Sequence, residues 1–262
     1  MEILPVLNYH GIEERRGEYP WADVETPYVI SSDMFLRHLD FLVSNQFVSL
    51  AADQLKEWFG GRFPNGRSII LTFDDGHISH YQYAVPALKQ KKLNAIFFIP
   101  VALVGQTNQM SWAQLKELAQ AGFEIGSHGY SHDALSGMTH HGLWRELERS
   151  KKMLEDRLGI RVRSFSVPKG YYQLRIREVA MELGYDFLFT SRFDVNLSHQ
   201  DPWRLSRLAI KKKTSFQEFS NVIYGRLGYK RIIEQAKEAA RRFLNPSIYD
   251  ALADWKQQVT HD

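Results

Sequence analysis

Apolar positions recur along this chain at two different spacings. Short apolar runs rich in β-branched and aromatic residues predict buried strands. They cover residues 3–8, 69–73, 95–99, 123–127, 162–167, 186–190 and 205–210. Longer stretches with apolar residues at helical spacing lie between these runs. They predict helices over residues 33–45, 51–59, 80–91, 112–121, 140–158 and 173–183.

The order of these elements indicates the fold class. Strands that alternate with helices predict βαβ units and a mainly parallel sheet, hence an α/β protein. A complete eightfold barrel takes about 250 residues, so seven strands in a shorter stretch predict a (β/α) barrel of about seven parallel strands that is short of a strand or irregular. The alternation ends near residue 212. We therefore expect a barrel domain over residues 1–212 and a helical C-terminal extension over residues 213–262, packed on the barrel.

The composition restricts the possible kinds of active site more than it restricts the fold. The 262 residues include 33 Lys and Arg, 30 Asp and Glu, and no cysteine. The length suffices for a sizeable core. Without cysteine, disulfides, thiol catalysis, Fe–S clusters and Cys-ligated zinc are excluded. Any metal must therefore be held by His, Asp and Glu.

The net charge of +3 is concentrated near the C-terminus. Residues 211–242 contain nine Lys and Arg against three Glu. Such a segment is able to contact nucleic acid or anionic lipid. Apolar residues recur at helical spacing within it, which favours an ordinary helix with its charges in solvent. We therefore expect no nucleic-acid partner.

Targeting signals are not visible in the sequence. The N-terminal apolar run is short and lacks a basic region before it. No window approaches the roughly 20 apolar residues that span a bilayer. The sequence as written thus predicts a cytoplasmic protein without a transmembrane segment, or an extracytoplasmic one if a leader has been removed.

Reactive residues gather where the predicted strands end. Carboxyl ends of parallel strands share one face of a barrel or sheet, and active sites form there. Four segments place such residues at that face: Tyr9 and His10, Asp74 and Asp75, His128 and His132, and the turn that contains Lys169.

Each of these motifs also has an ordinary structural interpretation. Asp-Asp-Gly after a strand is often a turn that leads into a helix cap. A His-x-x-x-His pair is often a surface pair on a helix. Together, however, two imidazoles and a carboxylate leave open coordination positions, which is typical of a catalytic metal site.

The motifs TFDDG, SHGYSH and SFSVPKGYY resemble those of the polysaccharide deacetylase (NodB-homology) family, carbohydrate esterase family four. The resemblance covers about residues 1–210 and implies a distorted (β/α) barrel. It also implies a hydrolase that removes N-acetyl groups from an N-acetylated carbohydrate. The opening PVLNYHGI is similar to the subgroup that deacetylates poly-N-acetylglucosamine, in which the first strand supplies the catalytic-acid histidine.

Carried over by motif, the resemblance implies a role for each residue. Asp75, His128 and His132 would bind the metal, expected to be zinc with Co, Ni, Mn or Fe as alternatives. Asp74 would be the general base and His10 the general acid. Substrate contacts are expected from Tyr9, Pro168, Lys169, Gly170 and Tyr171, with a backbone N–H near Tyr171 stabilising the oxyanion.

Two departures from the family pattern limit this transfer. The third motif commonly reads Arg-x-Pro-Tyr, but Ser166 stands for the arginine and Lys169 for the aromatic residue. The arginine normally orients the base, and we hypothesise that Arg207 replaces it. Lys169 would favour an anionic substrate group such as a uronate or phosphate. The usual late Leu-x-His is absent, which leaves His10 as the expected acid.

Two other functions remain open at this point. One is a non-catalytic carbohydrate-binding protein on a degenerate deacetylase fold, supported by the altered third motif. The other is a glycosidase, which needs two carboxyl groups about 5–9.5 Å apart around the scissile bond. The adjacent pair Asp74 and Asp75 suits that chemistry poorly.

Overall fold

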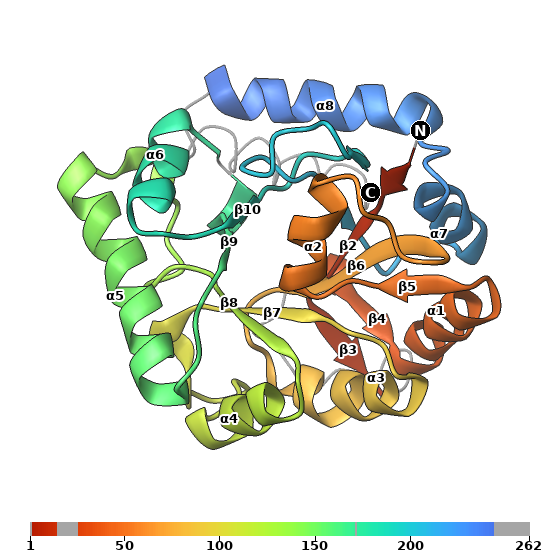
Figure 1. Cartoon of the computed structure of the whole chain (residues 1–262), viewed down its shortest axis with the longest axis horizontal. Helices are drawn as coiled ribbons and strands as arrows, with labels where there is room; N and C mark the ends of the chain where they lie inside the picture. Colours follow the sequence, from red (N-terminus) through yellow and green to blue (C-terminus); the bar gives the residue numbers. More distant parts are fainter. Residues whose placement is uncertain (1, 15–25, 171, 244–262) are drawn as a thin grey trace, which may run out of the picture. The chain divides into compact units, whose positions relative to one another are not determined.

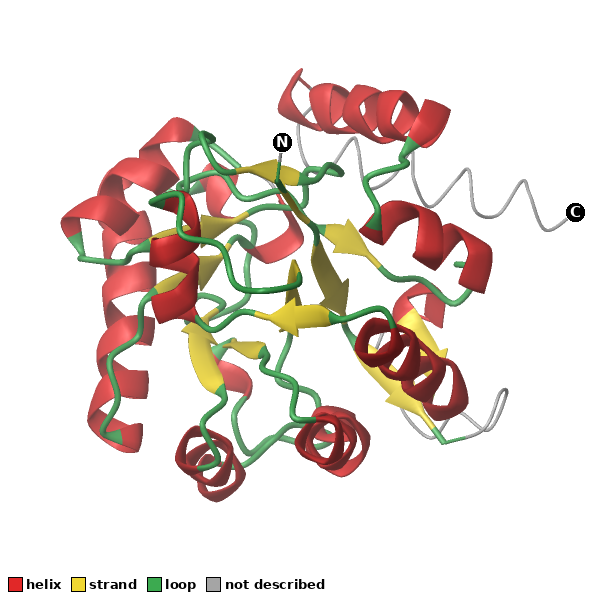
Figure 2. Ribbon diagram, turned by 45° about the vertical axis from the view of Figure 1, so that its right-hand side comes forward, coloured by secondary structure: helices red, strands yellow, loops and turns green. Residues whose placement is uncertain are grey.

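The computed structural model describes residues 2–14, 26–170 and 172–243. Within residues 26–226, helices lie around a central group of strands, as Figures 1 and 2 show. The helices are α1 (Ser32–Ser44), α2 (Ala52–Phe59), α3 (Val85–Lys91), α4 (Trp112–Gln120), α5 (His140–Leu158), α6 (Leu174–Glu182), α7 (Phe216–Ile223) and α8 (Gly228–Phe243).

One parallel sheet forms the centre of the fold. Its strands follow the order β10 (Phe187–Phe189), β9 (Ser164–Ser166), β8 (Glu124–Ser127), β7 (Ile96–Ile99), β6 (Arg67–Phe73), β2 (Val6–Tyr9) and β12 (Leu208–Ala209). A further strand, β5 (Phe47–Ser49), pairs in parallel with the start of β6. This arrangement confirms the predicted α/β class and the curled, barrel-like parallel sheet of seven strands.

The segment between residues 205 and 209 links the two edges of this sheet. Its first residue, Leu205, forms a parallel bridge with Phe189 at the end of β10. Its last residues form β12, where Leu208 pairs with Leu7 of β2. Residues on this segment therefore lie between the first and last strands of the barrel.

Smaller strands depart from the sequence expectation. Residues 3–8 form two strands, β1 (Ile3–Leu4) and β2, because Pro5 has no N–H to continue the ladder. β1 pairs antiparallel with β11 (Asn196–Leu197). β3 (Gly11–Glu13) and β4 (Val29–Ser31) form a separate parallel pair. Five of the short strands have two or three residues each, which are too few for a periodic pattern: β1, β3, β4, β5 and β11.

Helix starts follow from their capping residues. Ser31 accepts a hydrogen bond from the Met34 N–H at the start of α1. Ser111 caps α4, and the Gln114 side chain accepts from the Ser111 N–H in return. Such caps satisfy N–H groups that have no partner within the helix.

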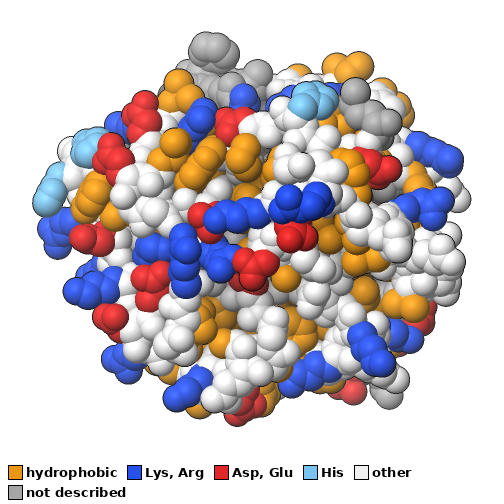
Figure 3. All heavy atoms as spheres, in the orientation of Figure 1, with side chains coloured by type: hydrophobic (Ala, Val, Ile, Leu, Met, Phe, Trp, Pro, Cys, Tyr) orange, Lys and Arg blue, Asp and Glu red, His pale blue; other side chains and the backbone are white. Residues whose placement is uncertain are grey.

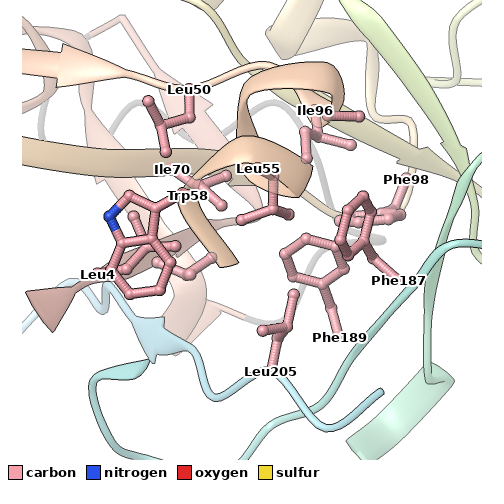
Figure 4. Packing of buried hydrophobic residues seen from close by; sticks show 12 residues of the cluster. Leu4, Leu50, Leu55, Trp58, Ile70, Ile96, Phe98, Phe187, Phe189 and Leu205 are labelled. Atoms are coloured by element: carbon pink, nitrogen blue, oxygen red, sulfur yellow. The ribbon is translucent and has the colours of Figure 1, made fainter. Parts of the chain in front are cut away.

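Helix α2 closes one end of the sheet with apolar side chains. Leu55 and Trp58 are fully buried there, and Figure 4 shows them pointing toward Leu4 and Ile70. The remaining members of this buried cluster come mainly from the sheet: Val6, Ile96, Phe98, Phe187, Phe189 and Leu205, with Leu50 and Ala52 beside α2. Truncation of a buried aromatic side chain of this kind to alanine costs about 3–5 kcal/mol.

The same face of the sheet becomes polar two residues further along. Successive residues of a strand point to opposite faces, so residues two apart share one face. Val6 is thus followed by Asn8, Ile70 by Thr72, and Leu205 by Arg207. All three polar side chains are buried. The interior therefore changes from an apolar core to a polar site toward the carboxyl ends of the strands.

The chain divides into two compact units, Met1–Arg226 and Leu227–Asp262. Helix α7 lies beyond the expected boundary at residue 212 but belongs to the first unit, where Phe219 stacks on His38 of α1 with ring centroids 3.8 Å apart. The second unit contains α8, on which Tyr229, Ile232 and Ile233 are exposed. Packing of residues 213–262 on the barrel as a whole stays a prediction.

The surface is mixed in charge. On the face drawn in Figure 3, acidic and basic side chains are interspersed, in keeping with a net charge of only +3. Among the helices that the structure describes, none is long and apolar enough to cross a membrane.

Candidate active site

Three potential metal ligands meet at the carboxyl end of the sheet. Asp75 follows β6, and His128 follows β8, with His132 in the loop beyond it. The Asp75 Oδ1 atom lies 3.0 Å from His132 Nε2 and 3.4 Å from His128 Nε2. Ligand atoms held about 2.0–2.1 Å from one tetrahedral ion are about 3.3 Å apart, so these side chains fit a divalent cation.

This group stands out among the described residues. A search of that part of the chain for three or more His, Cys, Asp or Glu ligand atoms close together finds Asp75, His128 and His132, all within 4.8 Å of one another. Burial would raise the pKa of Asp75. Hydrogen bonds from the two histidines outweigh it and hold that pKa well below its ordinary value of 3.8.

The orientation of His128 is set from the neighbouring strand. Its Nδ1 atom lies 2.9 Å from the carbonyl oxygen of Ser166 in β9. A carbonyl oxygen only accepts, so Nδ1 carries a proton, and Nε2, which faces Asp75, is the nitrogen that would bind a metal. A second hydrogen bond of this kind fixes the tautomer of many metal-binding histidines.

The carboxylate of Asp74 is buried beside this group. Arg207 Nη1 donates to Asp74 Oδ1 at 2.7 Å, and Asn8 Nδ2 donates to Oδ2 at 3.2 Å. The same Oδ2 atom lies 3.8 Å from His128 Nε2. Burial raises the pKa of Asp74, but the charge of Arg207 dominates and lowers it to about 2. The carboxylate is thus ionised and points toward the candidate metal position.

Arg207 is itself held firmly. It lies just before β12, rather than at a strand end, and its Nε atom donates to the Thr190 carbonyl oxygen at 3.0 Å. Its guanidinium carbon lies 5.7 Å from the ring centre of Phe98. These contacts leave Nη1 directed at Asp74.

His10 follows β2 and lies at the same end of the sheet. Its ring centre is 4.8 Å from that of Tyr28, and its carbonyl oxygen accepts from His80 Nε2. Within the described residues its buried Nδ1 atom has no hydrogen-bond partner. Burial lowers the pKa of His10, whereas the charges of Asp75 and Asp74 raise it. The net result is a pKa of His10 below its ordinary value, with the two carboxylates offsetting part of the effect of burial.

The predicted substrate contacts have different placements. Tyr9 is 1% exposed. Its ring stacks on Phe73 and its hydroxyl meets His38 Nδ1 at 3.2 Å. It therefore faces the core rather than the site, because its position in β2 alternates with that of Asn8.

The turn after β9 lies next to the metal-ligand loop. Pro168 is buried near Gly129, where a Cβ atom would lie 3.5 Å from the proline ring. Lys169 is exposed and has a positive φ of 56°. A Cβ on Gly170 would come within 2.5 Å of Ser191, so only glycine fits there. Tyr171 lies outside the described residues.

Sequence reasoning misses two residues of the site. Asn8 donates to the carboxylate of Asp74 and accepts from Thr72 Oγ1 at 3.2 Å. Tyr28 contacts His10 from η1 (Thr26–Tyr28). The polar residue within the apolar run of the first strand is the signal that points to Asn8. We find no signal in the sequence for Tyr28.

Comparison with known proteins points to one protein family. Residues 62–188 match the family model of polysaccharide deacetylase. The peptidoglycan-N-acetylglucosamine deacetylase of Bacillus cereus is 31% identical over 141 residues, which cover 53% of this chain and 61% of that relative.

Two solved structures share the fold over most of the chain. The Streptococcus pyogenes deacetylase PplD, in complex with acetate, superposes with a TM-score of 0.76 at 22% identity, covering 85% of this chain and 97% of its own. IcaB from Ammonifex degensii gives a TM-score of 0.73 at 25% identity, covering 86% and 97%. Over residues 62–188 the chain is therefore similar to the polysaccharide deacetylases, which are hydrolases acting on carbon–nitrogen bonds.

Proposed function

We propose that this chain is a metal-dependent hydrolase that removes N-acetyl groups from a glycan or glycan precursor. The products are acetate and a free amino sugar. The observation that carries this proposal is the convergence of Asp75, His128 and His132 beside the ionised carboxylate of Asp74. The similarity to polysaccharide deacetylases supports hydrolysis of a carbon–nitrogen bond.

Asp75, His128 and His132 would hold the metal. Zinc is our first choice, because two imidazoles and a carboxylate are ligands that zinc takes in catalytic sites. Co, Ni, Mn and Fe accept similar ligands. When bound, a divalent ion supplies Lewis acidity to the acetyl carbonyl and to the attacking water.

Asp74 acts as the general base in this proposal. Its ionised carboxylate takes a proton from the water as the new carbon–oxygen bond forms. Arg207 and Asn8 hold one oxygen each, so the carboxylate has a fixed direction before substrate arrives. Arg207 thereby takes the base-orienting role that we hypothesise from the sequence.

His10 donates a proton to the amine as the carbon–nitrogen bond breaks. Burial lowers the pKa of His10, and the charges of Asp75 and Asp74 offset part of this shift in favour of the charged ring that such a donor needs. The location of His10 directly after β2 supports the subgroup that acts on poly-N-acetylglucosamine, which the sequence resembles. The turn Pro168–Gly170 contacts the sugar, with Lys169 exposed beside the metal-ligand loop.

Acetate release from N-acetylated glycans tests this function directly. The Asp74→Asn variant is expected to lose about 10²–10⁴-fold in kcat with its metal content unchanged. Asp156→Asn, an exposed carboxylate on α5, is the matched control and retains full activity. His128→Ala loses both metal and activity.

Three results would contradict parts of this proposal. Full activity of Asp74→Asn excludes that carboxylate as the base. A purified protein that binds no divalent metal and releases no acetate, yet retains glycans, supports the non-catalytic carbohydrate-binding alternative. Shortening of the glycan chain without acetate release supports a glycosidase instead.

A further inference from the structure

The loop that joins the two histidine ligands has an unusual backbone. Gly129, directly after His128, has a φ of 78°, and His132 has a φ of 72°. A left-handed conformation costs a non-glycine residue about 1–2 kcal/mol. His132 therefore needs contacts from outside the loop to keep this conformation.

One side of the loop is held by the segment after β7. The N–H groups of Val101 and Ala102 donate to the carbonyl oxygens of Gly129 and Tyr130, at 3.2 and 2.8 Å. These bonds fix the first half of the loop. They do not reach the residues next to His132.

Helix α5 holds the other side through Glu146. Glu146 Oε1 accepts two hydrogen bonds from Ser131, at 2.5 Å from its backbone N–H and 2.9 Å from its hydroxyl. Ser131 directly precedes His132 in the sequence. The Ser131 hydroxyl also accepts from the Asp133 N–H at 3.1 Å, so both sides of His132 are tied to one carboxylate.

Neighbouring residues of α5 contact other parts of the loop. The Arg149 guanidinium lies 3.6 Å from the ring centre of Tyr130. Ser150 Oγ lies 2.7 Å from Ser127 Oγ, just before His128. Arg149 and Ser150 follow Glu146 by three and four positions, so all three lie on one face of the helix.

We propose that Glu146 is a positioning residue for the metal ligand His132. By anchoring Ser131, it keeps His132 in its left-handed conformation, with Nε2 directed at Asp75 Oδ1, 3.0 Å away. The inference rests on the metal site of the proposed function. Loss of a group that orients a metal ligand typically lowers metal affinity about 10–100-fold.

Two substitutions of Glu146 distinguish the effect of its reach from the effect of its charge. Glu146→Gln keeps the length and an acceptor oxygen but removes the charge. Glu146→Asp keeps the charge but is one methylene too short to reach Ser131. If Glu146 positions the loop, the Kd for Zn²⁺ rises at least tenfold in Glu146→Asp and stays within about threefold of wild type in Glu146→Gln.

Calorimetric titration of the metal-free protein with Zn²⁺ measures these constants. Glu148→Asp, on the exposed face of α5, is the control and leaves the Kd unchanged. Unfolding temperatures of the metal-free variants are recorded alongside. A merely structural role would lower the unfolding temperature of Glu146→Asp without changing its Kd, and would overturn the inference.

Three other results of the Zn²⁺ titration would contradict the inference or the proposed function. If wild type binds Zn²⁺ and Glu146→Asp binds it equally well, Glu146 does not position the ligand, while the proposed function stands. If Glu146→Gln loses as much affinity as Glu146→Asp, charge rather than position is responsible and the inference is wrong. If wild type itself binds no metal, the proposed function and this inference both fail.

Discussion

Glu124, at the start of β8, offers a sharp test of the electrostatics at the apolar end of the barrel. Its Oε2 atom accepts from the Ala52 N–H at 3.0 Å, and its Oε1 atom accepts from the Ser164 hydroxyl. Burial raises the pKa of Glu124 from 4.5 to about 7, and the nearby charge of Asp186 adds to this. The folded state therefore binds this proton more tightly than the unfolded chain does.

The sign of the pH dependence follows from that difference. A carboxyl group with a raised pKa in the folded state stabilises the fold fully below the unfolded value, near pH 4.5, and loses that contribution as pH rises through about 7. Each tenfold change in proton affinity is worth about 1.4 kcal/mol, so the upper limit is about 3 kcal/mol. Because Glu124 is only partly buried, we expect about 1.5 kcal/mol after screening by solvent.

The Glu124→Gln variant removes this titration and keeps both contacts. The amide oxygen still accepts from Ala52, and the amide nitrogen is able to donate to Ser164. We expect Glu124→Gln to be more stable than wild type by about 1.5 kcal/mol at pH 8 and equally stable near pH 4.

Urea unfolding of both proteins at several pH values measures this difference. Glu148→Gln serves as the exposed control and shows no pH-dependent change relative to wild type. A stability difference between Glu124→Gln and wild type that is the same at pH 4 and pH 8 would refute the reasoning. So would a loss of stability in the variant at pH 8.

Three other predictions follow from close contacts and exposed charge. A Cβ on Gly126 would lie 2.5 Å from the Phe98 ring, so Gly126→Ala should destabilise the fold by about 1–3 kcal/mol in thermal unfolding. Trp58→Ala removes a fully buried side chain and should cost about 3–5 kcal/mol in urea unfolding. Lys169→Gln should lower kcat/KM for an anionic N-acetyl sugar relative to a neutral one, and the ratio should become less sensitive to salt. An unchanged ratio excludes Lys169 as a selectivity residue.

Strand-end reasoning predicts the placement of the reactive residues because parallel strands end at one face. It brings Asp74, Asp75, His128 and His132 together from the sequence alone. It misses the contacts that orient them, because those depend on how distant segments meet. Asn8 lies 66 positions before Asp74, and no periodic pattern links the two.

The sequence also does not show where helix α7 packs, for a related reason. In α7, Phe219 stacks on His38 of α1, and Phe216 meets Phe41 of α1 edge to face. Sequence spacing shows that α7 is amphipathic but not which surface it covers. Its place in the first compact unit is set by that tertiary contact. Short strands such as β5 depend on pairing with β6 in the same way.

Asp74, the proposed base, shows how another residue can take over the contact of a replaced motif residue. Ser166 stands where the family motif commonly carries arginine, on β9, and it is fully buried. Asp74 nevertheless receives a guanidinium at 2.7 Å, from Arg207, which lies 133 positions away in the sequence. The segment that carries Arg207 pairs with β10 at one end and β2 at the other. In a curled sheet whose edges share such a segment, several strands reach the same point. The proposed base therefore requires a cation beside Oδ1 but not a particular strand to supply it.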